Sequence, residues 1–323
     1  MIVGLGALGC AAADHLVRAG VGTLTLIDRD IVELSNLQRQ TLFTEADARE
    51  GRPKAQAAAE RLGAVSSACR VSYQIADVTS ANAQKLLDEA RVRLAPGAPF
   101  ALLDGTDNFE TRYLLNDLAV SEGLPLVYAG VLGVTGLSAP FLPGHACLRC
   151  VFDSPPRPGS QATCDTVGVL GPAVAIAAAR QASDAIHFLA GRREAIDLAL
   201  HDFDLVSGRV RRVPLPAPRA GCVCCGLRQF EFLNAPPASA SLCGRNAVQI
   251  SPPPGAAGVD LGELATRWAG ARELRVSAHM VRGAFPVGGQ MLRLTVFADG
   301  RVLVSGTADS AAARAAVARY VGA

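Results

Sequence analysis

The stretch MIVGLGALGC, residues 1–10, decides the fold of the first part of the chain. A short apolar run leads into a G-x-G-x-x-G turn, and an alanine-rich helical stretch, Cys10–Ala19, follows. Gly20 and Gly22 interrupt that stretch, and Thr23–Ile27 has the β-branched and apolar character of a second strand. A strand, a helix and a second strand in this order predict a parallel sheet with helices on both faces.

The rest of the chain extends this pattern and then changes it. Further strands are expected at 70–75, 100–103 and 126–129, and helices at 44–62 with a turn at Gly51, 81–93, 109–121 and 170–189. Beyond a proline-rich stretch, the pattern predicts a helix at 261–269, strands at 273–281, 290–297 and 301–305, and a last helix at 310–321 capped by Ser310. The fold class is therefore α/β, with a Rossmann-like, doubly wound, mainly parallel sheet over residues 1–232 and a small α+β domain over residues 242–323.

Composition narrows the class of protein. Of the 323 residues, 50% are apolar and 19% are charged, which excludes general disorder. A net charge of +2 makes a nucleic-acid partner unlikely. The longest apolar run, Val167–Ala179, has 13 residues, whereas a membrane span needs about 20. No secretory signal is visible, so we expect a cytoplasmic protein without a membrane segment.

The glycine-rich turn and the acid after the next strand predict a nucleotide site. Gly4, Gly6 and Gly9 allow a tight turn, and the following helix N-terminus favours a phosphate. Asp28 stands 19 residues after Gly9, where a carboxylate can accept hydrogen bonds from ribose hydroxyls. These features alone fit an NAD-dependent oxidoreductase equally well.

A dense polar cluster after Asp28 favours a nucleoside triphosphate instead. It consists of Ser35, Asn36, Gln38, Arg39 and Gln40. Guanidinium and amide donors of this kind neutralise and orient phosphate groups. Only two lysines occur in the chain, and one of them, Lys54, stands at the start of a predicted helix. A lysine kept in so arginine-rich a sequence indicates a role that arginine cannot fill.

A second polar group follows the predicted strand at 100–103. Asp107 and Asn108 come at the end of that strand, where ligands of doubly wound sheets bind. Because Mg²⁺ is held by one or two carboxylates together with phosphate oxygens, Asp107 is the candidate magnesium ligand.

Two C-x-x-C pairs predict a metal site. Cys147 with Cys150, and Cys222 with Cys225, provide four thiolates, the set that suits a closed tetrahedral Zn²⁺ site. Cys224 lies inside the second pair and makes its ligands ambiguous, although Cys222 with Cys225 preserves the spacing. A redox-active pair is the alternative.

Taken together, these motifs resemble the ThiF/MoeB/HesA family of ubiquitin-activating-enzyme-like adenylyltransferases. The resemblance rests on residues 4–9, 28–30, 34–40, 53–54 and 106–108, in the order the family has them. It implies that Gly6 and Ala7 lie against the nucleotide, that Asp28 holds the ribose, that Asn36, Arg39 and Lys54 contact the triphosphate, and that Asp107 positions Mg²⁺. It further implies a homodimer and a zinc ion at the four cysteines.

The same resemblance implies a reaction. The C-terminal glycine carboxylate of a small ubiquitin-fold sulfur carrier ending in Gly-Gly attacks the α-phosphate of ATP, which gives an acyl-adenylate and pyrophosphate. Arg39, Lys54 and Asp107 are the expected catalytic residues. Cys164 is either a small core residue or a thiol that bonds covalently to the carrier. Family members usually carry an arginine-containing helix ahead of the first strand, whereas this sequence begins inside that strand.

Three alternatives stay open at this point. The first is an NAD-dependent oxidoreductase, against which the polar cluster and the cysteine pairs argue. The second is an ATP-dependent dehydratase of a modified tRNA base, from a related branch of the same superfamily. The third is an inactive scaffold. The pathway, whether thiamine, molybdopterin or tRNA thiolation, is not fixed by the sequence.

Overall fold

The computed structural model describes residues 1–156, 167–236, 241–242, 246–252 and 258–322. The chain divides into two compact units, Met1–Pro237 (unit 1) and Ala238–Ala323 (unit 2), and each is described by itself. Among the described residues, no helix is long and apolar enough to cross a membrane.

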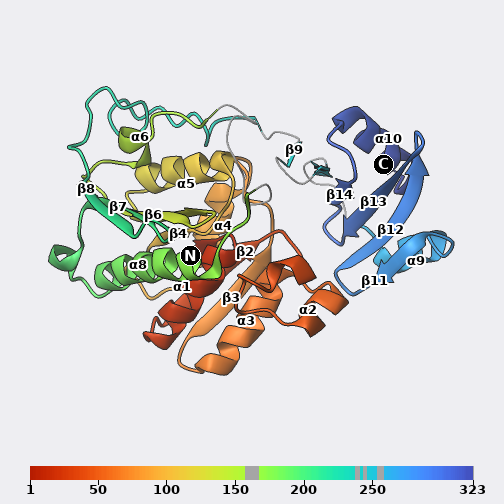
Figure 1. Ribbon diagram of the computed structural model, residues 1–323, viewed down its shortest axis with the longest axis horizontal. Helices are drawn as coiled ribbons and strands as arrows, with labels where there is room; N and C mark the ends of the chain where they lie inside the picture. The colour runs from red at the N-terminus through yellow and green to blue at the C-terminus, as the bar shows by residue number, and fades with distance from the viewer. Residues whose placement is uncertain (157–166, 237–240, 243–245, 253–257, 323) are drawn as a thin grey trace. The chain divides into compact units, whose positions relative to one another are not determined.

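Unit 1 is built on one mixed sheet of eight strands (Figure 1). In spatial order they are β3 (Arg70–Ile75), β2 (Thr23–Asp28), β1 (Ile2–Val3), β4 (Leu102–Asp104), β5 (Leu126–Leu132), β6 (Thr135–Phe141), β7 (Ala199–Asp204) and β8 (Arg209–Pro214). The pairs from β3 to β5 are parallel, and those from β5 to β8 are antiparallel. The predicted doubly wound, mainly parallel sheet is confirmed, with an antiparallel half that the sequence analysis did not contain.

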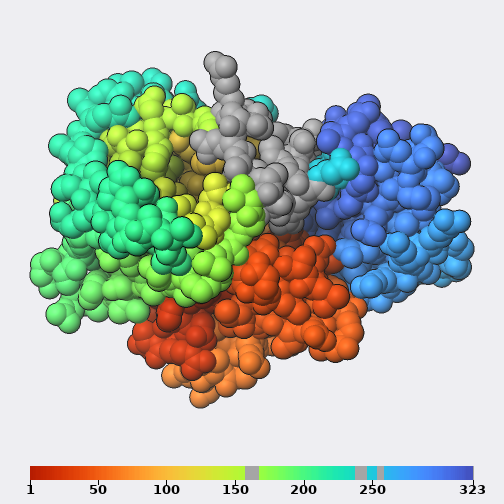
Figure 2. Space-filling view, viewed as in Figure 1, coloured from red at the N-terminus to blue at the C-terminus, as the bar shows by residue number. Residues whose placement is uncertain are grey.

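Helices cover both faces of this sheet (Figure 1). On one face lie α1 (Ala7–Arg18), α3 (Lys54–Val65) and α8 (Gly171–Leu189), and on the other lie α4 (Ala83–Arg91), α5 (Phe109–Ser121) and α6 (Leu148–Val151). The short helix α2 (Glu45–Glu50) precedes α3, and Figure 2 shows the orange surface of this region facing the viewer. Small side chains such as Ala173, Ala177 and Ala185 line the buried side of α8, which allows close packing on α1.

The position of β1 creates the site. It pairs with β2 on one side and with β4 on the other, so the strand order reverses at β1. Ligands of doubly wound sheets bind in the crevice beyond the carboxyl ends of the strands at such a reversal. The glycine-rich turn follows β1 at this place.

Unit 2 is an antiparallel sheet with two helices on one face. Its strand order is β11 (Arg272–Val276), β12 (Met280–Val287), β13 (Gln290–Phe297), β14 (Val302–Ser305), β10 (Ala247–Ile250) and β9 (Ser241–Leu242). The helices α9 (Leu261–Arg267) and α10 (Ser310–Tyr320) share a core with the sheet. In that core Phe285 packs between Trp268 and Tyr320, with ring centroids 4.6 and 4.3 Å away.

Two predictions about local structure need correction. The single strand expected at 273–281 is two strands, because a turn at Ser277 separates β11 from β12. The last helix is capped by Asp309, whose carboxylate accepts the Ala311 N–H at 2.8 Å, and Ser310 is its first residue. Strands β6, β7, β8 and β10 were not predicted.

Candidate active site

The glycine-rich turn is held against the end of β4 by contacts between backbones. Gly4 has φ +87°, a conformation that favours glycine, and a Cβ there would lie 2.7 Å from the backbone carbon and oxygen of Gly105. A Cβ on Gly9 would lie within van der Waals overlap of the Gly4 carbonyl oxygen. Gly4 and Gly9 therefore close the turn on the sheet and on the following helix.

Gly6 differs from these two glycines because the space beside it is open. The nearest atoms to a Cβ on Gly6 would be the Gly105 carbonyl oxygen at 3.9 Å and Gln40 Nε2 at 4.0 Å. Gly6 is also the N-cap of α1, and no side chain caps that helix end. The first N–H groups of α1, starting at Ala7, consequently face a space bordered by an amide donor, which suits a phosphate.

Asp28 ties the turn to the end of β2. Its two carboxylate oxygens accept the Leu5 N–H at 2.6 Å and the Asp30 N–H at 2.7 Å. The side chain is buried. Burial raises the pKa of Asp28 above its ordinary value, and the nearby Lys54 ammonium opposes that rise. Since each carboxylate oxygen can accept more than one hydrogen bond, Asp28 keeps capacity for ribose hydroxyls.

Lys54 is almost completely buried beside this carboxylate. Only 3% of its side chain is exposed, and its Nζ lies 3.1 Å from Asp30 Oδ2. The backbone fixes this position, because the Lys54 N–H donates to the Asp30 carbonyl at 2.9 Å and Ile31 bridges to Pro53. A buried ammonium held by carboxylates is a strong electrostatic group for an incoming anion.

The polar cluster after β2 starts with a short 3-10 turn, Leu34–Asn36. Asn36 is buried and its Oδ1 accepts the Glu33 N–H at 3.3 Å, so part of its role is to shape the turn. Ser35 is exposed, and its carbonyl accepts a hydrogen bond from Arg39 Nη1 at 3.0 Å. In the part of the chain that the structure describes, Arg39 has no carboxylate within ion-pair distance.

Gln40 is the member of this cluster that lies closest to the glycine turn. It is buried, with its Nε2 facing the space beside Gly6. Its Oε1 has no hydrogen-bond partner among the described residues. A buried amide oxygen without a partner is costly, which indicates that a ligand or water completes the site.

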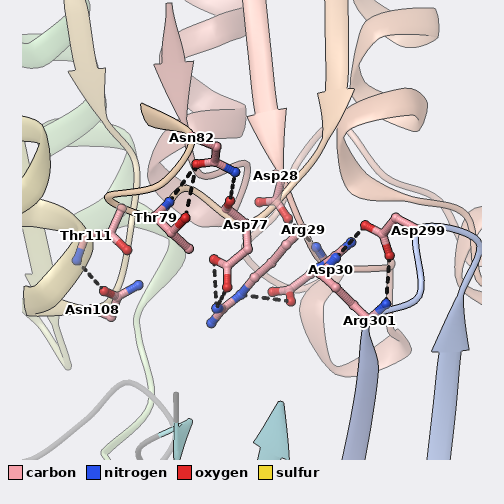
Figure 3. Close-up of polar contacts among 10 residues, drawn as sticks. All are labelled: Asp28, Arg29, Asp30, Asp77, Thr79, Asn82, Asn108, Thr111, Asp299 and Arg301. Carbon is pink, nitrogen blue, oxygen red and sulfur yellow. Dashed lines mark hydrogen bonds and ion pairs between the residues drawn. The ribbon is translucent and has the colours of Figure 1, made fainter. Parts of the chain in front are cut away.

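The loop after β4 supplies the third side of the site. Asn108 caps α5, since its Oδ1 accepts the Thr111 N–H at 2.7 Å (Figure 3). Asp107, next to it, is exposed at the carboxyl end of β4. An exposed carboxylate at this edge has the oxygen ligands that Mg²⁺ prefers.

Sequence analysis missed the charged residues that brace these loops. Asp104 is fully buried and pairs with Arg112 Nε at 2.8 Å, and its other oxygen accepts the Thr106 hydroxyl at 2.6 Å. Arg29 reaches across to Asp77, with 2.9 Å to each carboxylate oxygen (Figure 3). The available signal was position, because Arg29 and Asp104 stand at the carboxyl ends of β2 and β4.

The four paired cysteines come together in unit 1. The sulfur atoms of Cys147, Cys150, Cys222 and Cys225 all lie within 4.8 Å of one another. The closest pairs are 3.7 Å (Cys147 to Cys222) and 3.4 Å (Cys150 to Cys225) apart. Tetrahedral zinc with Zn–S bonds of about 2.3 Å places its sulfurs about 3.8 Å apart, so the group fits Zn²⁺.

Helix α5 contacts this cysteine group and Cys224, which packs beside it. Asn116 accepts the Leu148 N–H at 2.9 Å and donates to Cys224 Sγ at 3.2 Å. Its neighbour Asp117 accepts the Phe232 N–H at 2.8 Å. Cys224 therefore contacts α5, whereas the four residues whose sulfur atoms all lie within 4.8 Å of one another include Cys222 and Cys225.

Among the described residues, Cys10 and Cys69 belong to no candidate site. Burial raises the pKa of Cys10 to about 12, and it also raises the pKa of Cys69. Both thiols are therefore protonated and unreactive at neutral pH. Cys164 lies outside the described residues.

Comparison with known proteins identifies similar sequences and folds. Residues 1–224 match the ThiF family. The chain is 38% identical to the sulfur carrier protein ThiS adenylyltransferase of Bacillus subtilis, over 100% of this chain and 92% of that protein. It is 34% identical to the SAMP-activating enzyme E1 of Haloferax volcanii, over 70% of this chain and 79% of that protein.

A likeness to solved structures extends this result to the fold. The crystal structure of E. coli MccB with ATP superimposes with a TM-score of 0.56 at 21% identity, covering 70% of this chain and 66% of that chain. At this identity the likeness shows a shared fold only.

Proposed function

Since the chain belongs to the ThiF family, we propose that it is an ATP-dependent adenylyltransferase that activates the C-terminal glycine carboxylate of a ubiquitin-fold sulfur-carrier protein. The structural observation that carries the proposal is the space beside Gly6. An open helix N-terminus, the amide of Gln40 and the end of β4 border it, while the buried pair Asp28 and Lys54 lies behind the turn.

In this proposal different site residues contact different parts of the nucleotide. The backbone at Gly6 and Ala7 lies against the phosphates, and Asp28 accepts hydrogen bonds from the ribose. Donors from two segments hold the triphosphate. The first segment follows β2 and provides Ser35, Asn36, Arg39 and Gln40, and the second is the start of α3, which provides Lys54. Gly4 and Gly9 shape the turn, and Asn108 fixes the start of α5 beside Asp107.

In this reaction the protein contributes positioning and charge rather than covalent chemistry. A carboxylate oxygen of the carrier attacks the α-phosphorus, the bond from that phosphorus to the β-bridging oxygen breaks, and pyrophosphate leaves with its electron pair. Positive groups reduce the repulsion between the carboxylate and the triphosphate, and they stabilise the leaving group. Arg39 and Lys54 supply these charges. Mg²⁺, for which Asp107 is the proposed ligand, neutralises phosphate oxygens when it is bound.

We also propose that the four-cysteine group holds a structural Zn²⁺. A site with four thiolate ligands has no open position, so the metal stabilises the segment that follows β6 and the segment that follows β8 rather than reacting. Cysteines that bind zinc rather than form disulfides fit a reducing compartment, which supports the cytoplasmic location in this proposal. A homodimer is proposed on the family resemblance alone.

Cys164 is kept as the candidate thiol for a covalent link to the carrier. If it has that role, Cys164→Ser leaves adenylation intact and removes the covalent enzyme–carrier product on a non-reducing gel. If Cys164 is a core residue, the variant changes stability and leaves that product unchanged.

The tRNA-base dehydratase is the second candidate within the superfamily. The cysteine group and the match to a sulfur carrier protein adenylyltransferase over 100% of this chain favour carrier activation. One experiment separates the two. The full chain is incubated with ATP labelled at the α-phosphorus and a purified ubiquitin-fold carrier ending in Gly-Gly.

We expect label to become attached to the carrier, with release of unlabelled pyrophosphate. A carrier that lacks its last glycine is the matched control and stays unlabelled. Label transfer to a tRNA substrate without any carrier, or formation of ADP, contradicts the proposal.

A further inference from the structure

The sheet of unit 2 has a second face that α9 and α10 do not cover. The core with these helices uses Val281, Phe285 and Leu294. Because alternate residues of a strand point to opposite faces, the register places four arginines on the other face. They are Arg272 and Arg275 of β11, Arg282 of β12 and Arg293 of β13, and we name this set the arginine face.

The pairing brings these side chains into neighbouring positions. Arg275 stands directly opposite Arg282. Ala284 of β12 is paired with Arg272 on one side and with Arg293 on the other. Arg282 donates to the Thr295 hydroxyl at 3.0 Å. The small Ala284 side chain therefore stands between Arg272 and Arg293 on this face.

One carboxylate reaches into this surface through a break in the strand. The register of β11 shifts between Arg272 and Arg275, and Glu273 in the bulge has φ +53°. Its Oε2 accepts hydrogen bonds from Arg293 Nε at 3.1 Å and Nη2 at 2.8 Å. Because β12 separates β11 from β13, this ion pair spans β12. A β-bulge re-aims a side chain in this way.

This arrangement contributes little to folding. Both partners of the ion pair are about half exposed, at 58% for Glu273 and 47% for Arg293, and exposed pairs stabilise a fold weakly. A left-handed non-glycine residue is strained, and such strain is concentrated at functional positions. The pKa of Glu273 is lowered first by Arg293 and also by Arg275 and Arg282, which shows a positive field where its carboxylate lies.

We propose that the arginine face binds an acidic segment of a partner polypeptide through its carboxylates, and that Glu273 is an internal competitor that occupies Arg293 until a partner carboxylate replaces it. The proposal concerns unit 2 and does not depend on the function proposed for unit 1. The Glu273 carboxylate already shows the geometry by which Arg293 accepts such a group. Strand β11 is at the edge of its sheet, and extended segments bind to exposed edge strands in many complexes.

Three observations favour a polypeptide over a nucleic acid. The group already bound to Arg293 is a carboxylate. Arg272, Arg275 and Arg293 suit one or two carboxylates, whereas a protein that makes about 6–10 phosphate contacts needs a larger basic surface. Phe297, the aromatic residue in register on this face, is only 6% exposed and therefore offers little surface for stacking a base.

Fluorescence anisotropy with the full chain tests the proposal. The probe is fluorescein-labelled hexaglutamate, and the control probe is labelled hexaglutamine. The informative variants are Arg293→Ala, Arg275→Ala and Glu273→Gln. The matched control is Arg314→Ala, which removes an exposed arginine from α10 on the other side of the sheet. Circular dichroism melts verify that each variant is folded.

We expect hexaglutamate to bind and hexaglutamine not to bind, with an affinity that falls as salt rises. Arg293→Ala and Arg275→Ala each weaken binding by about 2- to 5-fold or more, and Glu273→Gln tightens it by about 2- to 5-fold. Arg314→Ala leaves the affinity unchanged. The gain with Glu273→Gln is the result expected if the Glu273 carboxylate competes with the probe for Arg293.

Several results would overturn the proposal. Hexaglutamate could fail to bind the wild-type chain, Glu273→Gln could weaken or not alter binding, or Arg314→Ala could weaken it as much as Arg275→Ala. A labelled RNA oligonucleotide that binds more tightly than hexaglutamate, with the same dependence on these arginines, would assign the surface to a nucleic acid instead.

Discussion

Replacing Gly6 by alanine is expected to weaken ATP binding while leaving the fold intact. Gly6 has φ −72° and ψ −151°, about 30° beyond the extended region that alanine prefers, so the substitution adds only modest backbone strain. The added Cβ would have its nearest neighbours at 3.9 and 4.0 Å, which is ordinary van der Waals contact. The protein accommodates the methyl group, but that group occupies the space in which a phosphate would meet the N-terminus of α1.

The expected magnitudes follow from these distances. Alanine is a poorer N-cap than glycine by about 0.5–1 kcal/mol, and for a unit of this size that lowers Tm by about 1–4 °C. Gly4→Ala is the contrasting variant, since its Cβ would lie 2.7 Å from backbone atoms of Gly105 at φ +87°. Overpacking and left-handed strain together cost about 2–4 kcal/mol there, or roughly 4–16 °C in Tm.

Two assays separate the effects. Thermal melts measure stability, and isothermal titration calorimetry measures ATP affinity at a temperature where both variants are folded. We expect Gly6→Ala to raise the Kd for ATP by about tenfold or more, which is ~1.4 kcal/mol, with a small change in Tm. Wild-type affinity in Gly6→Ala would refute the placement of the phosphates beside Gly6. A large loss of stability in that variant would refute the open space.

Three further predictions concern the magnesium ligand, the cysteine group and a buried acid. Asp107→Ala should abolish adenylation in a label-transfer assay with Tm within about 2 °C of wild type, because Asp107 is exposed; normal turnover would remove it from the site. Cys147→Ser should release zinc, measured by metal analysis, and lower Tm by roughly 4–8 °C, while an unchanged metal content would contradict a site with four cysteine ligands. Burial raises the pKa of Asp184 in α8 to about 6, against an ordinary value of 3.8. Between about pH 4 and 6 the native state therefore keeps a proton that the unfolded state has released. As a result, the free energy of unfolding falls as the pH rises through this range. Asp184→Asn should therefore be more stable than wild type by about 1–3 kcal/mol at pH 7–8, with the difference disappearing near pH 4 in denaturant titrations; a difference independent of pH would show that Asp184 does not titrate this way.

The parallel half of the sheet could be predicted from the sequence because its signals are local. The strand at 70–75 and the helix at 109–121 have the predicted bounds, and the helix expected at 170–189 is α8. In each of these elements apolar residues recur at the spacing typical of that structure, and polar residues or glycine mark its ends. The antiparallel strands β7 and β8 lacked such signals, since β8 is exposed along its whole length and carries three arginines.

The candidate site was predictable where chemistry and position coincide. Asp28, Lys54 and the four paired cysteines were identified because few roles suit such residues at those places. The supports of the site were not predictable, because they depend on contacts far apart in the chain. Gln181 is an example, since its fully buried Nε2 donates to the Asp104 and Val127 carbonyls, each at 2.8 Å, from the middle of an apolar helix.

Pyrophosphate exchange into ATP tests the central claim most directly, because it reports reversible attack of a carboxylate on the α-phosphorus and nothing else. With the wild-type chain and a carrier ending in Gly-Gly, the account predicts exchange that requires the carrier and is lost in Asp28→Ala. No exchange with such a carrier, together with tight binding of NADH, would contradict it and identify the glycine turn as a dinucleotide site.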